Sequence, residues 1–454
     1  MGESRAVMKQ KDMIITSWGR NRNAEMTALR PERLSAVTAA LRQPGVGTGT
    51  IAYGDGRNYG DLAMCQNGRI VLTRRLNRIL SFEKDTGLVS VEPGVTFREL
   101  HSFASEHGFL VPVVPGTAFV TLGGGVASDI HGKNQDTQGC LGDHIEWLDL
   151  VVASGDVIRV SRSEHPKLFS ATIGGCGLTG VISAIGLRLR QLKANAVSVE
   201  EWRVKDLDSF FDLIHQHRTS STYTVGWVDA LQKGRSLGRG IFQAAEPVFS
   251  DGFSPRTSNR KIPFTCPDAT LNRASVQAFN SIYYRRVPKN GRSRIVGYEE
   301  FHHPLDAISD WNRLYGKSGF FQFQCVLPDE SAAIGIRRLL ERISGAQAAS
   351  FLAVLKTFGK EGLGDLSFPR PGVTLSLDIP ARGGGREFVE SLDALTLDHG
   401  GRVYLAKDAT LTAERFALMY PKLDEFRETL SRYDPECLFV SDLARRLKVR
   451  PTPS

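Results

Sequence analysis

The spacing of apolar residues in the first half of the chain predicts short strands with a few helices between them. Within residues 30–43, four apolar residues recur three or four positions apart, as on one face of a helix: Leu34, Val37, Ala40 and Leu41. A second helix is predicted over residues 97–108, where Thr96 and Glu99 have the spacing of a capping box. Short apolar runs predict strands over residues 48–53, 70–72, 79–82, 88–91, 145–153, 157–160 and 181–189, with 109–114 extended.

One predicted strand in the second half alternates strictly between polar and apolar residues. Residues 320–327, FFQFQCVL, place Gln322 and Gln324 on one face of this strand and the phenylalanines on the other. Two glutamines on one face indicate either a solvated sheet surface or the hydrogen-bonding floor of a polar pocket. The remaining patterns predict strands over residues 373–379 and 402–407 and helices over 413–420 and 423–431.

Glycines and small residues gather in one stretch, residues 115–134, PGTAFVTLGGGVASDIHGKN. A backbone of this composition can approach a ligand closely and expose N–H groups to a phosphate. No strong helix or strand former dominates, so we expect a ligand-binding loop, with a plain glycine-rich connection as the alternative. A second such segment, residues 54–61, GDGRNYGD, follows a predicted strand and suits a turn that holds a diphosphate.

The segment Gly175 to Gly180 matches the G-x-G-x-x-G pattern of dinucleotide-binding Rossmann folds. A Rossmann site needs a helix after these glycines and an acidic residue about 20 positions later. Residues 181–189 alternate like a strand instead, and the next acidic residue is Glu200. We therefore expect a turn from a helix into a strand here, and no nicotinamide site.

Composition and charge describe a globular chain that is large enough for two domains. The chain has 454 residues, of which 41% are hydrophobic and 23% charged. No apolar run reaches the roughly 18 residues that span a bilayer, and residues 1–20 lack the apolar core of a Sec signal. The six cysteines are scattered singly without a CxxC pair, so we expect reduced thiols, no metal site and a cytoplasmic location.

The formal net charge of +8 is moderate and forms no basic stripe with interleaved aromatic residues, so no nucleic-acid partner is expected. Basic residues gather only near the C-terminus, at Arg445, Arg446, Lys448 and Arg450. Two interpretations of this cluster stay open. It is either the solvated end of a helix or a surface that attracts an anionic substrate or the inner face of a membrane.

Several motifs together resemble the vanillyl-alcohol-oxidase-type FAD-binding family, and within it the decaprenylphosphoryl-ribose 2′-oxidases. They are GDGRNYGD, PGTAFVTLGGGVASDIHGKN, GGCGLTGVI, FHHPLDAISDWN, YLAKDAT and the terminal YPKLDEFRETLSRYDPECLFVSDLARRL. The resemblance covers nearly the whole chain and is weakest over residues 230–295. It implies an α+β fold, with an FAD-binding domain of residues 1–195 completed by residues 409–454. A substrate domain built on an antiparallel sheet, residues 196–408, is inserted between them.

The resemblance also implies which residues bind FAD, which we expect to be held non-covalently, although related proteins sometimes attach it at the equivalent of His131. The expected FAD-binding residues are Gly54, Gly56, Arg57, Asn58, Tyr59, Gly60, Gly116, Thr117, Thr121, Gly123, Gly124, Ala127, Ser128, Asp129, His131, Asn134, Gly177, Val181 and Tyr404. The expected substrate-binding residues are Lys133, Trp227, His302, Gln322, Gln324, Lys356, Thr374 and Ser376. Trp227 and His302 can equally be core residues.

The implied reaction is oxidation of the 2′-hydroxyl of a polyprenyl-phosphoryl ribose, with Lys407 at that hydroxyl as the catalytic residue. The keto product would pass to a separate NAD(P)H-dependent short-chain keto-reductase. Thr374 and Ser376 stand where mycobacterial relatives carry Asn and Cys, and His302 replaces a tyrosine, so substrate contacts are expected to differ. Two alternatives are an aldonolactone or alditol oxidase of the same superfamily and a catalytically silent flavin-binding subunit.

Overall fold

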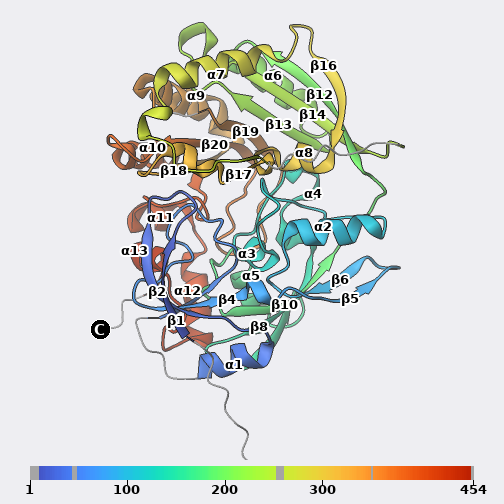
Figure 1. Ribbon diagram of the computed structural model, residues 1–454, viewed down its shortest axis with the longest axis vertical. Helices are drawn as coiled ribbons and strands as arrows, with labels where there is room; N and C mark the ends of the chain where they lie inside the picture. Colours follow the sequence, from blue (N-terminus) through green and yellow to red (C-terminus); the bar gives the residue numbers. More distant parts are fainter. Residues whose placement is uncertain (1–9, 43–48, 252–259, 349–350, 451–454) are drawn as a thin grey trace, which may run out of the picture.

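The computed structural model describes residues 10–42, 49–251, 260–348 and 351–450, and these form two halves (Figure 1). The lower half in this view contains the N-terminal strands and the C-terminal helices, and the upper half contains one large sheet with its helices. Helices combined with mainly antiparallel sheets confirm the predicted α+β class.

Two sheets form the lower half. The first has the order β1 (Gln10–Thr16), β2 (Asn23–Leu29), β4 (Arg69–Leu72) and β3 (Thr50–Tyr53), with parallel pairing on both sides of β4. The second is antiparallel, in the order β5 (Ile79–Glu83), β6 (Leu88–Val91), β10 (Val181–Arg188), β8 (Ile145–Val151) and β9 (Val157–Ser161). The helices of this half are α1 (Leu34–Arg42), α2 (Phe97–Glu106), α3 (Leu122–Ala127), α4 (Gln135–Gln138), α5 (Pro166–Thr172), α11 (Ala413–Met419), α12 (Leu423–Tyr433) and α13 (Asp442–Arg446).

An eight-stranded antiparallel sheet forms the upper half. Its order is β16 (Arg292–Gly297), β12 (Ala196–Val204), β14 (Gly240–Val248), β13 (Tyr223–Val228), β19 (Ala353–Phe358), β20 (Gly372–Pro380), β18 (Phe320–Pro328) and β21 (Arg402–Val403). The helices around it are α6 (Leu207–His217), α7 (Arg273–Arg285), α8 (Tyr298–His302), α9 (Asp329–Ala346) and α10 (Gly385–Asp398). Two small pairs complete the strands, β7 (Phe109–Leu110) with β11 (Arg190–Gln191), and β15 (Arg260–Lys261) with β17 (Ile308–Ser309).

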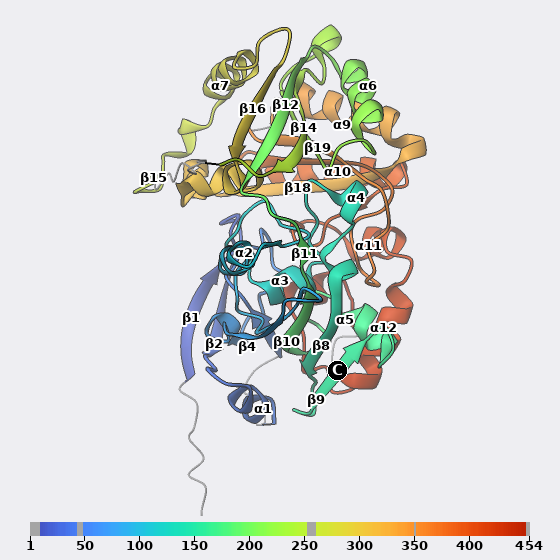
Figure 2. The same cartoon turned by 90° about the vertical axis from the view of Figure 1, so that its right-hand side faces the viewer.

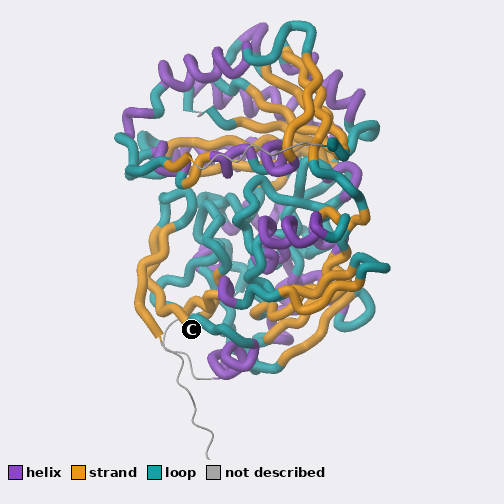
Figure 3. Tube along the Cα trace, turned by 45° about the vertical axis from the view of Figure 1, so that its right-hand side comes forward, coloured by secondary structure: helices purple, strands orange, loops and turns teal. Residues whose placement is uncertain are grey.

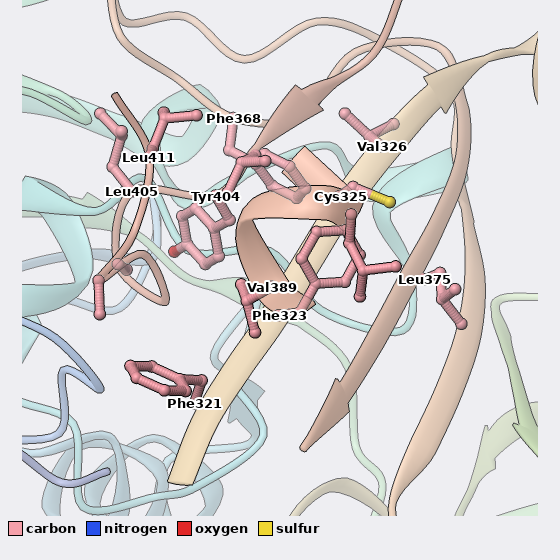
Figure 4. Close-up of a cluster of buried hydrophobic side chains, with 14 of the residues drawn as sticks. Phe321, Phe323, Cys325, Val326, Phe368, Leu375, Val389, Tyr404, Leu405 and Leu411 are labelled. Atoms are coloured by element: carbon pink, nitrogen blue, oxygen red, sulfur yellow. The ribbon is translucent and has the colours of Figure 1, made fainter. Parts of the chain in front are cut away.

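The alternation in β18 separates an apolar face from a polar one. Phe321, Phe323 and Cys325 are buried in the core that continues to Val389 of α10 (Figure 4). Gln322 and Gln324 point to the opposite face, towards the lower half, and both are buried. The strand is therefore covered on both sides, and the interpretation of its glutamines as a solvated surface is wrong.

Most predicted elements of the first half are present, and local hydrogen bonds explain where they begin. Thr96 caps α2 by accepting a hydrogen bond from the backbone of Glu99, whose side chain in turn accepts from the backbone N–H of Thr96. Residues 173–180 join α5 to β10, a helix-to-strand turn that does not have Rossmann geometry.

The expected loop over residues 115–134 is only partly a loop, because it contains the short helix α3. Thr121 caps this helix by accepting a hydrogen bond from the backbone of Gly124. A Cβ added to Gly123 would lie 2.7 Å from Pro93, and one added to Gly125 would lie 2.9 Å from Phe97. These two glycines thus permit close packing of a helix, and composition alone could not distinguish that role from ligand contact.

The strand predicted over residues 402–407 is also shorter than expected. β21 pairs with β18 at only two positions, and after Val403 the chain makes a turn in which Lys407 donates its backbone N–H to the carbonyl of Tyr404. Tyr404 still donates its backbone N–H to the carbonyl of Gln324. The turn returns Lys407 towards the junction of the two halves.

The basic C-terminal residues are mostly paired inside the protein, so neither interpretation of that cluster holds for them. Arg446 forms ion pairs with Asp61 at 2.7 Å and with Asp408 at 2.9 Å, both of which are buried. Arg450 is buried and forms an ion pair with Asp434. These contacts attach the C-terminal segment to the N-terminal half, and Val440 pairs with Thr50 through its backbone.

Within residues 10–42, 49–251, 260–348 and 351–450, no helix is both long and apolar enough to cross a bilayer. No disulfide joins any of the six cysteines, all of which lie in the described ranges.

We predict that Arg446→Met destabilises the protein strongly. The substitution leaves two buried carboxylates, Asp61 and Asp408, without their cation, which costs about 3–5 kcal/mol. Exposed Arg432, on α12, provides the control, since Arg432→Met is expected to change stability by less than about 0.5 kcal/mol. Thermal unfolding checks both variants, and equal midpoints would contradict the assignment of Arg446 as a structural clamp.

Candidate active site

A cavity of about 1300 Å³ lies where the two halves meet. Figure 3 shows loop segments of the lower half meeting the strands of the large sheet at this level. The cavity is larger than the roughly 300–1,000 Å³ of most small-molecule sites, so it can hold two ligands side by side. Its walls come from the glycine-rich loops, the turn after β21 and the inner face of the sheet.

The sheet contributes a polar floor from adjacent strands. Gln324 of β18 is paired with Ser376 of β20, and Ser376 is paired in turn with Val354 of β19. Lys356 follows two positions along β19, on the same face as Val354. Trp227 of β13 completes the row and donates its indole N–H to the carbonyl of Phe351 at 2.9 Å.

His131 is held against this floor by Gln324. The amide nitrogen of Gln324 lies 3.0 Å from Nε2 of His131, so Nε2 accepts and Nδ1 carries the ring hydrogen. Nδ1 is buried and has no partner among the described residues. Burial, reinforced by Lys356 and Lys407, lowers the pKa of His131 well below its usual value, so the imidazole is neutral.

A buried carboxylate lies beside the second glutamine. Asp378 of β20 accepts a hydrogen bond from the amide of Gln322 at 2.6 Å and another from the hydroxyl of Tyr315 at 2.8 Å. Burial raises the pKa of Asp378, while these two hydrogen bonds and the charge of Lys407 act in the opposite direction. The carbonyl oxygen of Gln322 is buried and unpartnered within the described chain, and the residue lines the cavity.

Three lysines line the cavity, and burial lowers the pKa of each. The pKa of Lys133 falls to about 7 and that of Lys356 to about 8. For Lys407 burial again lowers the pKa, while the charge of Asp378 raises it. Each of these side chains is only partly exposed. An anion bound in the cavity would favour the charged ammonium form and so raise the pKa of each lysine again.

Lys407 is positioned by the approach of two loops. Its ammonium nitrogen lies 4.2 Å from the centre of the Tyr59 ring, a cation–π distance. The backbone of Tyr59 donates to the carbonyl of Ala406 at 3.3 Å. Gly60 makes the approach possible, because a Cβ there would lie 1.9 Å from the carbonyl oxygen of Asp408. Lys407 forms no ion pair with any residue in the described ranges.

The loop before Tyr59 adds a further cation. Arg57 pairs with Asp55 at 2.7 Å and lies over the rings of Trp18 and Phe119. Gly56 has a φ of +64°, a left-handed conformation that favours glycine. The loop thus follows the cavity wall with its backbone and one arginine.

Most of the residues singled out from the sequence come together at this cavity. Those that line it are Gly54, Gly56, Arg57, Asn58, Tyr59, Gly116, Thr117, Thr121, Gly124, Ser128, His131, Lys133, Trp227, His302, Gln322, Gln324, Lys356, Ser376, Tyr404 and Lys407. Those outside its lining are Gly60, Gly123, Ala127, Asp129, Asn134, Gly177, Val181 and Thr374.

The residues outside the lining support those within it. Asp129 is fully buried and accepts hydrogen bonds from the backbone of Gly142 and the hydroxyl of Ser367. Asn134 donates to the carbonyl of Pro112 at 2.8 Å. Thr374 lies on the same face of β20 as Ser376, paired with Lys356 of β19 and 3.3 Å from the amide nitrogen of Gln324.

Backbone contacts place the glycine-rich turn from Gly175 to Gly180 behind α3. The carbonyl of Ala127 accepts the backbone N–H of Cys176 at 2.9 Å. Gly177 has a φ of +76°, and Val181 pairs with Val151 in the sheet. These residues therefore shape the cavity from behind.

Two features of the site were not identified from the sequence. One is the inner face of α7, with Val276, Phe279 and Tyr283, whose helical spacing was a usable signal in the region of weakest resemblance. The other is the partnership of Asp378 with Gln322. No spacing rule reveals that pair, because it depends on the register between β18 and β20.

The residues present fit a bound FAD. The unpartnered donor Nδ1 of His131 and the unpartnered acceptor oxygen of Gln322 are buried at the cavity, where a flavin ring offers both complements. A Cβ added to Gly116 would meet nothing within 4 Å, so that backbone is open to a ligand. Arg57 supplies positive charge for a pyrophosphate.

Comparisons with known proteins agree with this fit. Residues 28–161 match the model of the FAD binding domain, and residues 381–447 match that of D-arabinono-1,4-lactone oxidase. Decaprenylphosphoryl-beta-D-ribose oxidase of Mycolicibacterium smegmatis is 35% identical, over 96% of this chain and 97% of that protein. L-gulono-1,4-lactone dehydrogenase of Mycobacterium tuberculosis is 21% identical, over 87% of this chain and 89% of that protein.

We predict that Lys356→Met stabilises the protein at neutral pH in the absence of substrate. Lys356 has a pKa of about 8 when folded and about 10.4 when unfolded, so the unfolded chain binds its proton first. The unfolding free energy due to Lys356 therefore falls as pH drops from about 10.4 to about 8, and then stays constant.

The expected gain at pH 7 is about 1–3 kcal/mol after allowance for partial exposure, and it disappears above about pH 10.5. Exposed Lys84, replaced in the same way, is the control. Denaturant unfolding across this pH range measures the difference, and a gain that does not depend on pH would contradict the explanation.

Proposed function

The chain belongs to the decaprenylphosphoryl-β-D-ribose oxidase family, and from this premise we propose that it oxidises the 2′-hydroxyl of a polyprenyl-phosphoryl-β-D-ribose to the 2′-keto sugar. It is an FAD-dependent oxidoreductase that acts on a CH–OH group. One observation carries the choice of substrate. The three lysines converge on a cavity that has a polar floor at one side and an apolar wall at the other.

The polar side suits a ribose phosphate. Burial lowers the pKa values of Lys133 and Lys356, neither of which forms an ion pair with a described residue, and a phosphodiester would supply an anion. Gln322, Gln324 and Ser376 offer amide and hydroxyl groups to the sugar hydroxyls. The apolar side suits the prenyl chain, since Trp227, Phe279, Tyr283 and Phe351 line it.

Lys407 is assigned to the reacting hydroxyl. Bound FAD supplies the acceptor for the hydride that leaves the carbinol carbon. Lys407 orients the hydroxyl and removes its proton, a role for which burial lowers the pKa of the amine towards neutrality. The charge of Asp378 partly offsets this lowering of the Lys407 pKa, and Asp378 also holds Gln322 in place beside the substrate. The surrounding walls exclude water from the reacting atoms.

The proposed domain organisation separates FAD binding from substrate binding. We place FAD binding in residues 1–195 and 409–454 and substrate binding in residues 196–408. The ion pairs of Arg446 with Asp61 and Asp408 support this division, because they join the C-terminal segment to the N-terminal loop and to the turn that carries Lys407. The keto product is consumed by a separate NAD(P)H-dependent short-chain keto-reductase, which completes an epimerisation.

An aldonolactone oxidase is the second candidate, because residues 381–447 match a lactone-oxidase model. That match covers a small part of the chain, and a neutral lactone gives no partner to Lys133 and Lys356. A catalytically silent flavin protein has no need of an unpaired lysine such as Lys407 at the cavity. The 2′-oxidase therefore explains more of the site than either alternative.

We predict that Lys407→Met lowers kcat by roughly 10²–10⁴-fold with a short-chain polyprenyl-phosphoryl ribose and leaves the FAD content unchanged. The reason is the loss of the group that takes the hydroxyl proton. Lys317→Met, at an exposed position, is the control and should retain full activity. Turnover is followed with an artificial electron acceptor. Undiminished kcat in the Lys407 variant would remove it from the catalytic role.

We also predict that FAD is held without a covalent bond. Nε2 of His131 is engaged by Gln324, and Nδ1 is a hydrogen-bond donor in the neutral ring. Acid precipitation of the purified protein should therefore leave the yellow flavin in the supernatant. Flavin that remains with the pellet, together with a peptide heavier by the mass of FAD, would show attachment.

A further inference from the structure

The solvent-facing side of α7 is apolar, whereas that of an ordinary surface helix is polar. α7 buries only Val276 and Asn280, and Ala274, Ala278 and Ile282 follow at intervals of four along its solvent side. Ile282 is 73% exposed, and the neighbouring Phe279 is 44% exposed. A surface helix normally turns its apolar stripe towards the core. This apolar stripe is therefore available to something outside the described chain.

Large exposed apolar side chains are concentrated around this helix. Three of the eleven in the described chain fall within residues 260–285, namely Phe264, Phe279 and Ile282. Figures 1 and 2 show α7 at the outer edge of the upper half, and Figure 2 places β15 along the same side. The segment thus presents several apolar groups on one side of the molecule.

The same segment carries most of the net charge of the chain. Residues 260–295 contain one acidic residue, Asp268, and eight basic residues: Arg260, Lys261, Arg273, Arg285, Arg286, Lys289, Arg292 and Arg294. Three of these arginines share the buried carboxylate of Glu201. Arg260, Arg273, Arg285 and Lys289 form no ion pair with any described residue. Exposed apolar groups among unpaired cations are the pattern of a helix that lies on an anionic lipid surface.

The cavity reaches the surface at this segment. Five of its lining residues are exposed and belong to residues 260–295: Lys261, Thr270, Ser275, Phe279 and Arg286. Phe279 stands at the edge, since it contacts Tyr283 and Phe351 of the apolar wall and is also open to solvent. A long prenyl chain that enters the cavity would therefore pass beside α7.

We propose that the surface formed by α7 and its flanking residues, 260–295, docks on the face of a bilayer that contains anionic phospholipids. Ile282 and Phe264 enter the interface, and the unpaired arginines and lysine contact the head groups. The mouth of the cavity then faces the bilayer, so a lipid-linked substrate can enter without its prenyl chain crossing water. Only this last step rests on the proposed function, because the docking surface is defined by exposure and charge alone.

Vesicle co-sedimentation of the full-length protein tests the proposal. The probes are vesicles of phosphatidylcholine alone and vesicles of phosphatidylcholine mixed with phosphatidylglycerol. The protein should bind the mixed vesicles but not the neutral ones, and added salt should release it, because the attraction is screened. The combined variant Ile282→Asp, Arg285→Glu and Lys289→Glu should weaken binding at least about tenfold.

A matched variant separates the surface from a general effect of charge and polarity. Leu418→Asp with Lys422→Glu and Arg432→Glu changes one apolar residue, 70% exposed, and two exposed cations in and beside α11 and α12, so its change in net charge equals that of the α7 variant. This control should bind mixed vesicles like the unaltered protein. Equal binding by the α7 variant and the control, or no binding by the unaltered protein, would overturn the proposal. Dimers in solution that the α7 variant breaks, without vesicle binding, would assign the surface to a second copy of this chain.

Activity distinguishes a failure of the docking surface from a failure of the proposed reaction. None of the three altered residues lines the cavity. The α7 variant should therefore oxidise a water-soluble, short-chain polyprenyl-phosphoryl ribose as fast as the unaltered protein, and a long-chain substrate embedded in vesicles at least about tenfold more slowly. Vesicle binding without oxidation of either substrate would reject the reaction and leave the docking surface supported.

Discussion

The site depends on one buried ionic cluster, the guanidinium of Arg446 between the carboxylates of Asp61 and Asp408. Asp61 ends the glycine-rich segment that contains Tyr59, and Asp408 directly follows Lys407. Asp408 also accepts the backbone N–H groups of Thr410 and Leu411 at 2.8 Å. One cation from the C-terminal helix therefore fixes both loops that meet at the cavity. Without it two buried charges would repel each other, and Lys407 would lose its place over Tyr59.

The chemistry follows from ammonium groups that are buried without an ion-pair partner among the described residues. Lys133, Lys356 and Lys407 have lowered pKa values because the cavity removes water from them and no carboxylate replaces it fully. Such an arrangement is costly in the empty protein and becomes favourable when an anion binds. Burial also lowers the pKa of Lys407, so a larger fraction of this amine is unprotonated and able to accept a proton at neutral pH. Asp378, held by Gln322 and Tyr315, partly offsets the lowering of the pKa at Lys407, the residue assigned to the proton transfer.

The sequence predicted more of the site than of the local structure around it. Alternation in β18 correctly placed Gln322 and Gln324 on one face, since a period of two is set by the strand itself. Of the α3 glycines expected at FAD, Gly124 lines the cavity and Gly123 packs against Pro93, because small residues serve ligand approach and helix packing alike. The paired arginines near the C-terminus misled, since their carboxylate partners lie far away in sequence. The helical spacing of α7 was a signal that went unused, whereas the role of Asp378 could not be assigned because it arises from the register between β18 and β20.

The measurement that tests the central claim most directly is an anaerobic titration of the purified protein in a visible spectrometer. Short-chain polyprenyl-phosphoryl ribose should bleach the flavin bands and yield a product lighter by two hydrogens, with a ketone at C2′. Free ribose and aldonolactones should leave the bands unchanged, because neither offers an anion to Lys133 and Lys356. Bleaching by an aldonolactone alone, or by none of these compounds, would contradict the account.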